Sequence, residues 1–310
     1  MNCLHAQLEL EALLHITGPD SLKFLQGQTT CDTRKVSPTN AVPGAFCTPQ
    51  GRVVCDFLLC ELGPEHFALR MRRAIRASSS TAFAKYIVFS KAKLEAERDD
   101  WKIIAVWGNE AAATLREIFG EVPDTLYGVS RADNAVLVQT DKLGRQFECY
   151  LPDTSSDEIR ARLAPASGAG SEASWQAQQI ANGIARIEAA TVGEFVPQTL
   201  NYDLTGHISF NKGCYTGQEV VARLHYRGKA KRRTYLFELN SETTCIAGAP
   251  LYTDGHEQPV GEIVNACYYV GKTHLLATST ANGLSTGLRL GAPDGPLLTL
   301  VPLPYSVAFE

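Results

Sequence analysis

The sequence lacks any apolar run close to the roughly 20 residues that a membrane-spanning helix requires, so no membrane segment is expected. It also lacks a strong excess of either charge, because 29 Lys and Arg residues stand against 33 Asp and Glu residues. The resulting net charge of −4 gives no whole-chain basic field, and direct binding of nucleic acid is not expected. A length of 310 residues with 45% hydrophobic residues is typical of a globular protein with one large domain or two ordinary ones.

The nine cysteines include no Cys-x-x-Cys pair, and the two that lie nearest in sequence are Cys55 and Cys60. This odd number and this spacing match neither a disulfide framework nor a zinc site. The seven histidines include no His-x-x-x-His pair, so no metal site is expected. The N-terminal segment has no basic start of the kind that signal and transit peptides carry. These absences favour a cytoplasmic protein in which most thiols are inert packed groups.

Strand and helix patterns mix along the first two thirds of the chain without strict alternation, which favours an α+β fold over a doubly wound one. Strands are expected at 10–16, 66–71, 135–140 and 145–151, with a hairpin at 45–62 and a β pair at 92–97 and 101–107. Helices are expected from Gly18 to a stop at Gly27, after 66–71 as far as Tyr86, from an Asn109 cap to Gly120, and from a Ser171 cap with Ile180, Ile184 and Ile187 on one face.

The pattern changes beyond Arg233, where short β runs are separated by Gly, Pro and the Asp254-Gly255 pair. No helix is expected in this part of the chain. The sequence therefore predicts an α+β domain over residues 1–228 and a small all-β domain, a sandwich or a barrel, over residues 229–310.

The segment from Lys212 to Glu219, KGCYTGQE, carries the densest chemistry. Thr216 and Glu219 have the Thr-x-x-Glu spacing of a capping box and precede an apolar run, so a helix is predicted to begin at Thr216. Cys214 would then lie two residues before a helix N-terminus and beside Lys212, and both features favour a thiolate. Spacing alone leaves open the alternative that Cys214 is a packed cysteine beside a tight turn.

The octapeptide KGCYTGQE resembles the signature of the YgfZ family, the folate-binding relatives of the T-protein (aminomethyltransferase) of the glycine cleavage system. The flanking segments IEAATVGEFVPQTLNYDLTGHISFN and VVARLHYRGKAKRR are also similar to that family, as is the N-terminal ITGPDSLKFLQGQTTCD. The resemblance covers most of the chain. It implies a T-protein-like folate-binding α+β domain followed by a C-terminal all-β barrel.

The resemblance also implies a function and a site. Tetrahydrofolate or a derivative is expected in a central channel, and the implied role is support of iron–sulfur enzymes, including enzymes that modify tRNA, as clients. Cys214 is the residue that the family ties to activity. The folate-binding residues implied or suggested by the motif are Arg186, Glu188, Lys212, Gly213, Tyr215, Gly217, Gln218, Glu219 and Arg223.

Glu188 lies in Arg186-Ile187-Glu188-Ala189, at the position of the acid that recognises the pterin in T-proteins. Its carboxylate is able to accept two parallel hydrogen bonds from the amino and ring N–H groups of a pterin. Without the family, a surface acid paired with a neighbour is the simpler interpretation. Gly213 and Gly217 would allow a sharp bend or a close approach to a ligand.

The sequence departs from true T-proteins at their pair of adjacent acids, which follows a Gly-containing hairpin. In GRVVCDF, residues 51–57, Cys55 replaces one acid and Asp56 remains. Asp56 is therefore the candidate catalytic acid of an alternative function, a folate-dependent aminomethyl-type one-carbon transferase. Because the KGCYTGQE cysteine is not a T-protein feature, an accessory factor is favoured over a classical transferase, and whether the protein is an enzyme stays open.

Basic residues form two clusters, which are Arg70, Arg72, Arg73 and Arg76 in one part and Arg223, Arg227, Lys229, Lys231, Arg232 and Arg233 in another. Either cluster fits the glutamate tail of a folate, and cations at a helix C-terminus are the simpler alternative. A third hypothesis is an interaction module whose basic cluster docks a partner or RNA. The net charge and the lack of interleaved aromatic residues, with only His225 and Tyr226 among the cations, argue against RNA.

Overall fold

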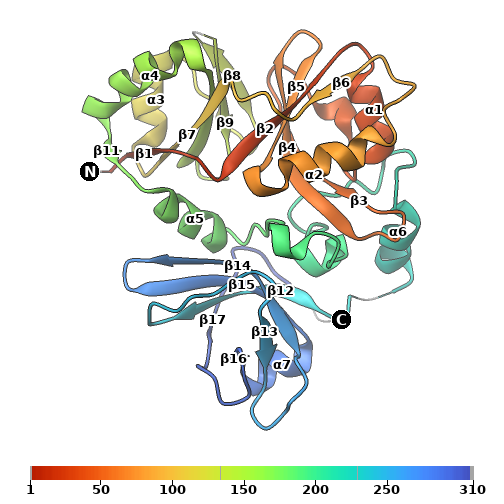
Figure 1. Ribbon diagram of the computed structural model, residues 1–310. Helices are drawn as coiled ribbons and strands as arrows, with labels where there is room; N and C mark the ends of the chain where they lie inside the picture. Colours follow the sequence, from red (N-terminus) through yellow and green to blue (C-terminus); the bar gives the residue numbers. More distant parts are fainter. Residues whose placement is uncertain (1, 133, 229, 308–310) are drawn as a thin grey trace. The chain divides into compact units, whose positions relative to one another are not determined.

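The computed structural model describes residues 2–132, 134–228 and 230–307 (Figure 1). The chain divides into two compact units. The first comprises the chain up to Gly44 together with Phe57–Trp175, and the second comprises Ala45–Asp56 and the chain from Gln176 onward. This division does not coincide with the predicted domain boundary after Gly228, which stays a prediction.

The first unit contains two sheets with helices. A six-stranded sheet has the order β11-β1-β7-β10-β9-β8, with β1 Leu4–Gln7, β7 Trp101–Trp107, β8 Val129–Ala132, β9 Ala135–Gln139, β10 Gln146–Pro152 and β11 Gly168–Ala169. A five-stranded sheet has the order β3-β4-β5-β2-β6, with β2 Glu11–Thr17, β3 Val42–Cys47, β4 Val53–Gly63, β5 His66–Arg72 and β6 Lys93–Glu95. The helices are α1 Ser21–Gln28, η1 Thr33–Lys35, α2 Arg73–Ala84, α3 Ala111–Phe119 and α4 Asp153–Ala166. Helix α5 Glu172–Ala181 connects the two units in sequence, and the β3–β4 hairpin tip belongs to the second unit.

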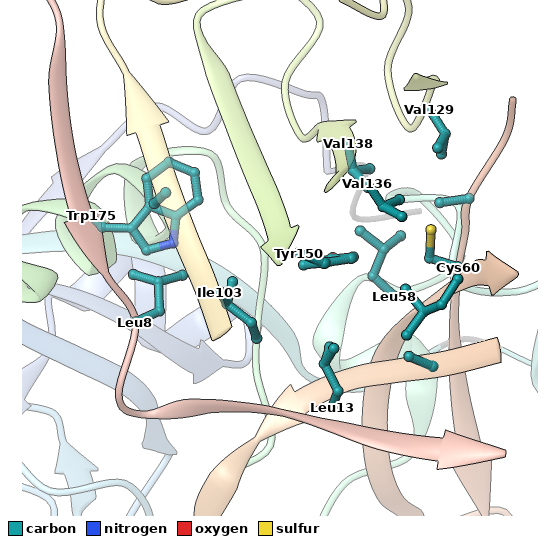
Figure 2. Close-up of a cluster of buried hydrophobic side chains, with 14 of the residues drawn as sticks. Leu8, Leu13, Leu58, Cys60, Ile103, Val129, Val136, Val138, Tyr150 and Trp175 are labelled. Atoms are coloured by element: carbon teal, nitrogen blue, oxygen red, sulfur yellow. The ribbon is translucent and has the colours of Figure 1, made fainter. Parts of the chain in front are cut away.

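Side chains from both sheets meet in one core of the first unit, shown in Figure 2. Leu13 of β2 and Leu58 of β4 pack there with Ile103 of β7 and Tyr150 of β10. The alternate residues of β7, such as Ile104, pack instead into a second core under α3 and α4. Strand β7 is apolar on both faces because each face covers a core, which explains its continuous hydrophobic run.

Several predicted elements are confirmed, including the hairpin turn at 48–51 and the strands β2, β5, β9 and β10. Helix α3 ends at Gly120, which has a φ of 82°, and the Ser171 hydroxyl accepts a hydrogen bond from the Ser174 N–H at 3.1 Å, as predicted. Three local predictions are wrong. Gly27 lies inside α1, Asn109 gives way to Glu110 as the N-cap of α3, and α5 ends at Ala181 before Ile184 and Ile187.

The expected β pair between 92–97 and 101–107 is also wrong. Strand β6 pairs with β2, whereas β7 pairs with β1 and β10, so the two segments lie in different sheets. Proximity in sequence favours a hairpin, but here pairing with strands distant in sequence replaces the local pair.

The second unit contains a curled antiparallel sheet that forms half of a barrel (Figure 1). Its order is β16-β13-β14-β15-β12-β17, with β12 Arg233–Leu239, β13 Pro250–Tyr252, β14 Gly261–Tyr269, β15 Lys272–Ser279, β16 Arg289–Leu290 and β17 Thr299–Val301. The other elements are η2 Ala189–Thr191, η3 Pro197–Leu200, α6 Gln218–Tyr226 and α7 Ala281–Thr286. The α+β fold with a C-terminal β region is confirmed. The expectation of no helix there misses α7, whose N-cap Thr280 accepts from the Gly283 N–H at 3.1 Å.

Within the part of the chain that the structure describes, no helix is both long enough and apolar enough to cross a membrane.

Candidate functional site

Asp56 and Arg186 form an ion pair inside the second unit. Asp56 is 2% exposed and Arg186 is 4% exposed. One carboxylate oxygen of Asp56 accepts from Nε of Arg186, and the other accepts from the backbone N–H of Ile187 at 2.6 Å. A buried carboxylate with both oxygens engaged serves to fix the 186–187 segment.

Asn265 of β14 holds the same segment from another side. Its Oδ1 accepts from the Arg186 N–H at 2.8 Å, and its Nδ2 donates to the Arg186 carbonyl at 3.0 Å. Nδ2 also lies 3.0 Å from the carboxylate oxygen Oε1 of Glu188. No motif in the sequence pointed to Asn265, although a lone amide in the apolar run of β14 needs hydrogen-bond partners when it is buried.

Tyr202 adds a further hydrogen bond to this region, from its hydroxyl to the carbonyl of Ala185 at 3.0 Å. Burial raises the pKa of Tyr202 well above its ordinary value, and the negative charge of Asp56 adds to the shift. The Tyr202 hydroxyl therefore stays protonated and acts as a donor. Residues 185–188 are thus held at four successive positions before the chain enters η2.

Glu188 is half-buried and stands at the N-cap of η2. Its backbone N–H donates to the Thr191 hydroxyl at 3.1 Å, which fixes the start of the turn. The carboxylate is oriented by Asn265 and retains access to the surface. A half-exposed carboxylate with a fixed orientation suits planar donor groups such as those of a pterin.

The KGCYTGQE segment differs from its predicted local structure. Helix α6 begins at Gln218, its N-cap is Gly217 with a φ of 84°, and no side-chain cap bond is made, so the predicted Thr216–Glu219 capping box is wrong. A Cβ at position 217 would lie 2.4 Å from the Thr48 carbonyl oxygen, so only glycine fits this contact with the hairpin. Gly213 has open space around it and meets no such constraint.

Cys214 lies in the loop before α6 and is exposed, four residues ahead of Gln218. Cys245 is partly exposed, and the other seven cysteines are buried. Burial raises the pKa of the Cys60 thiol to about 12, and it also raises those of Cys47 and Cys149. Cys214 therefore differs from the buried thiols in access, and its thiolate character stays a prediction.

The other motif residues take different positions. Lys212 and Tyr215 are both buried, with the Lys212 ammonium 5.0 Å from the centre of the Tyr215 ring. Gln218 closes the turn, because its side-chain oxygen accepts from the Tyr215 N–H at 3.2 Å. Glu219 and Arg223 are exposed on α6.

The first basic cluster is neutralised within its own unit. Arg70 lies 2.9 Å from Glu148, Arg72 lies 2.9 Å from Glu11, and Asp99 lies 2.9 Å from Arg73 and 2.6 Å from Arg76. In the second cluster Arg233 lies 2.6 Å from Asp203, and Lys229 lies outside the described residues. Arg223, Arg227 and Lys231 are exposed.

No group of three or more His, Cys, Asp or Glu side chains within residues 2–132, 134–228 and 230–307 is arranged to hold a metal ion.

The chain has the fold of a T-protein. The solved glycine cleavage system aminomethyltransferase T from Bartonella henselae matches with a TM-score of 0.78 at 14% identity, over 98% of this chain and 86% of that one, which shows the fold alone. Residues 8–130 match the family of the GCVT N-terminal domain.

The chain is also 33% identical over 301 residues to the tRNA-modifying protein YgfZ of Yersinia pseudotuberculosis serotype IB (strain PB1/+), covering 96% of this chain and 91% of that one. It is 34% identical over 240 residues to the tRNA-modifying protein YgfZ of Escherichia fergusonii, covering 77% and 73% respectively. The chain belongs to the YgfZ family.

Proposed function

We propose that the protein binds tetrahydrofolate or a derivative through Glu188 and supports the assembly or repair of iron–sulfur enzymes, including enzymes that modify tRNA, with Cys214 as its reactive group. The observation that carries the proposal is the hydrogen-bonded support of Glu188. Asn265 orients its carboxylate at 3.0 Å, and Asp56 anchors the preceding backbone at 2.6 Å. Such a supporting network is what a binding residue needs to hold its geometry.

Glu188 suits tetrahydrofolate, the cofactor that the family resemblance implies. A pterin presents an amino group and a ring N–H side by side, and a carboxylate in a fixed plane accepts from both. When bound, tetrahydrofolate supplies a carrier for one-carbon units. The residues of this chain would recognise the pterin at Glu188 and keep that carboxylate in position through Asn265.

Cys214 suits a role in cluster chemistry because its thiol is reachable from outside, whereas seven other thiols are buried. An exposed thiol is able to ligate iron transiently. The relatives in Yersinia pseudotuberculosis and Escherichia fergusonii are named tRNA-modifying protein YgfZ, which supports tRNA modification as the process that this chain serves. Such a role places the protein in the cytoplasm with its client enzymes.

The alternative of an aminomethyl-type transferase with Asp56 as its acid has less support. Both oxygens of Asp56 are engaged, and the residue is 2% exposed, so the carboxyl group has little access to a substrate. A catalytic acid needs to be within hydrogen-bond reach of the reacting group.

The proposal is tested in a bacterial strain that lacks its own YgfZ. Wild-type protein is expected to restore the level of tRNA modifications made by iron–sulfur enzymes, and Cys214→Ser is expected to lose this support while it remains folded. Cys245→Ser, at the partly exposed cysteine, is the matched control and should behave as wild type. Full support by Cys214→Ser would contradict the role of the thiol.

A further inference from the structure

Three aromatic rings meet on the surface of the second unit. Phe210 and His225 stack face to face, with their ring centres 3.6 Å apart and their planes 12° apart. Tyr226 meets both edge-on, with its ring centre 4.7 Å from that of His225 and 6.3 Å from that of Phe210. Tyr226 is 67% exposed, and His225 is also exposed. These rings therefore present aromatic surface to solvent at the C-terminal end of α6.

Two arginines lie close to these rings along the chain. Arg223 and Arg227 are four residues apart, and the Arg227 N–H continues the helical pattern by donating to the Arg223 carbonyl at 2.9 Å. Spacing of four residues puts Arg223 and Arg227 near each other, and Tyr226 neighbours Arg223 at a spacing of three. Both arginines are exposed, and within residues 2–132, 134–228 and 230–307 neither guanidinium has an ion-pair partner. Arg233, in contrast, is satisfied by Asp203 at 2.6 Å.

The helix dipole alone does not account for exposed aromatic rings beside unpaired arginines. It favours cations in the last turn of a helix, but it gives no reason for aromatic rings to remain in water beside them. Exposed aromatic rings beside cations without ion-pair partners are typical of surfaces that bind single-stranded nucleic acid. Bases stack on the aromatic faces, and phosphates pair with the cations. An acidic peptide would use the cations and leave the rings uncovered.

We infer that Phe210, Arg223, His225, Tyr226 and Arg227, the α6 aromatic surface, bind an unpaired stretch of nucleic acid. A base stacks on the exposed rings, and the two arginines contact neighbouring phosphates. The sequence-based expectation against nucleic acid rested on the net charge and on a lack of interleaved aromatic residues. Folding adds an aromatic ring to the second basic cluster by bringing Phe210 to His225. The inference goes beyond folate binding and does not depend on it.

The same rings connect the surface to the candidate thiol. Phe210 precedes Cys214 by four residues, and His225 follows it on α6, so the stack joins the two ends of the segment that carries Cys214. The Phe210–His225 stack therefore belongs both to the proposed nucleic-acid surface and to the segment that presents the Cys214 thiol.

The test uses the full-length protein without folate and two labelled single-stranded oligonucleotides, one of RNA and one of DNA. Binding is measured by fluorescence anisotropy at a series of salt concentrations. Tyr226→Ala is expected to weaken binding by about 5- to 150-fold, which corresponds to the loss of one base stack. Arg223→Gln and Arg227→Gln are each expected to reduce the slope of log K against log salt by about 0.7.

Tyr268→Ala is the matched control, because Tyr268 is an exposed tyrosine of the same unit, on β14. It should bind as wild type, and preference for one oligonucleotide shows whether RNA or DNA is the ligand. The inference is overturned if neither oligonucleotide binds at low salt, or if Tyr226→Ala binds as tightly as wild type. The inference is also overturned if polyglutamate displaces the labelled oligonucleotide as effectively as the unlabelled oligonucleotide does. Since folate is absent from this assay, its outcome is separate from that of the proposed function.

Discussion

A single side-chain amide, that of Asn265, joins strand β14 to the candidate pterin acid Glu188. Its Nδ2 lies 3.0 Å from Oε1 of Glu188, across 77 positions of sequence. Asn265 stands where the pairing of β14 with β15 changes register after Ile263. Such irregularities commonly redirect a side chain, and here the amide also satisfies the buried backbone of Arg186. The orientation of Glu188 therefore depends on the C-terminal sheet.

Asn265→Ala is expected to weaken the binding of tetrahydrofolate about tenfold, because a hydrogen bond to a charged group contributes about 1.5 kcal/mol or more. Calorimetric titration measures the affinity. Asn201→Ala is the control, since this buried amide donates to the Thr234 carbonyl at 2.7 Å. It should lower stability while the affinity stays unchanged. An unchanged affinity in Asn265→Ala would show that Glu188 needs no support.

Asp56→Ala is expected to lower the free energy of unfolding by about 3–5 kcal/mol, because it leaves the buried Arg186 guanidinium without its carboxylate. Urea denaturation measures this loss. Asp157→Ala removes the carboxylate of an exposed pair with Arg160 and should cost no more than about 1 kcal/mol. Equal and small effects of both substitutions would contradict an anchoring role for Asp56.

Protonation of His15 is expected to lower the stability of the protein in mild acid. His15 is fully buried, its Nδ1 lies 2.9 Å from Nε2 of His66, and burial together with His66 lowers its pKa to about 4. The unfolded chain binds this proton near pH 6.5, so the stability that the neutral ring provides is complete above that pH and is lost as the pH falls toward 4. Between pH 7 and pH 5 the loss from this group is about 2 kcal/mol.

Urea denaturation at both pH values, on wild type and His15→Phe, measures this contribution. The variant should lose less stability on acidification than wild type. His256→Gln, at an exposed histidine, should follow wild type. The same pH dependence in His15→Phe as in wild type would rule out His15 as its source.

Alkylation of the native protein should show one fast thiol, that of Cys214. It is exposed, whereas burial raises the pKa of Cys60 to about 12 and hinders access to it. Mass spectrometry after brief maleimide treatment identifies the labelled residue, and Cys214→Ser should remove the fast phase. The pH dependence of the rate then tests the predicted thiolate. Fast labelling at a buried cysteine such as Cys149 would contradict the burial described above.

Local signals predicted much of the fold. The turn at 48–51, the end of α3 at Gly120 and the Ser171 cap each depend on a few neighbouring residues, whose preferences the chain follows. The Thr216–Glu219 spacing failed as a capping box because the hairpin carbonyl of Thr48 requires a left-handed glycine at 217. A tertiary contact replaced a local one.

The candidate site was only partly predictable. The resemblance identified Glu188 and Cys214, but their surroundings depend on distant partners. Asp56 is 130 positions from Arg186, and no periodicity brings them together. Sequence placed Asp56 among catalytic candidates and Arg186 among folate ligands, whereas the fold pairs them with each other.

The most direct test of the account is a calorimetric titration of tetrahydrofolate into the wild type, Glu188→Ala and Cys214→Ser. Glu194→Ala is the matched control, since Glu194 is an exposed acid of the same unit. The wild type, Cys214→Ser and Glu194→Ala are expected to bind tetrahydrofolate, and Glu188→Ala is expected to lose binding. Absence of binding by the wild type, or wild-type affinity in Glu188→Ala, would contradict this expectation.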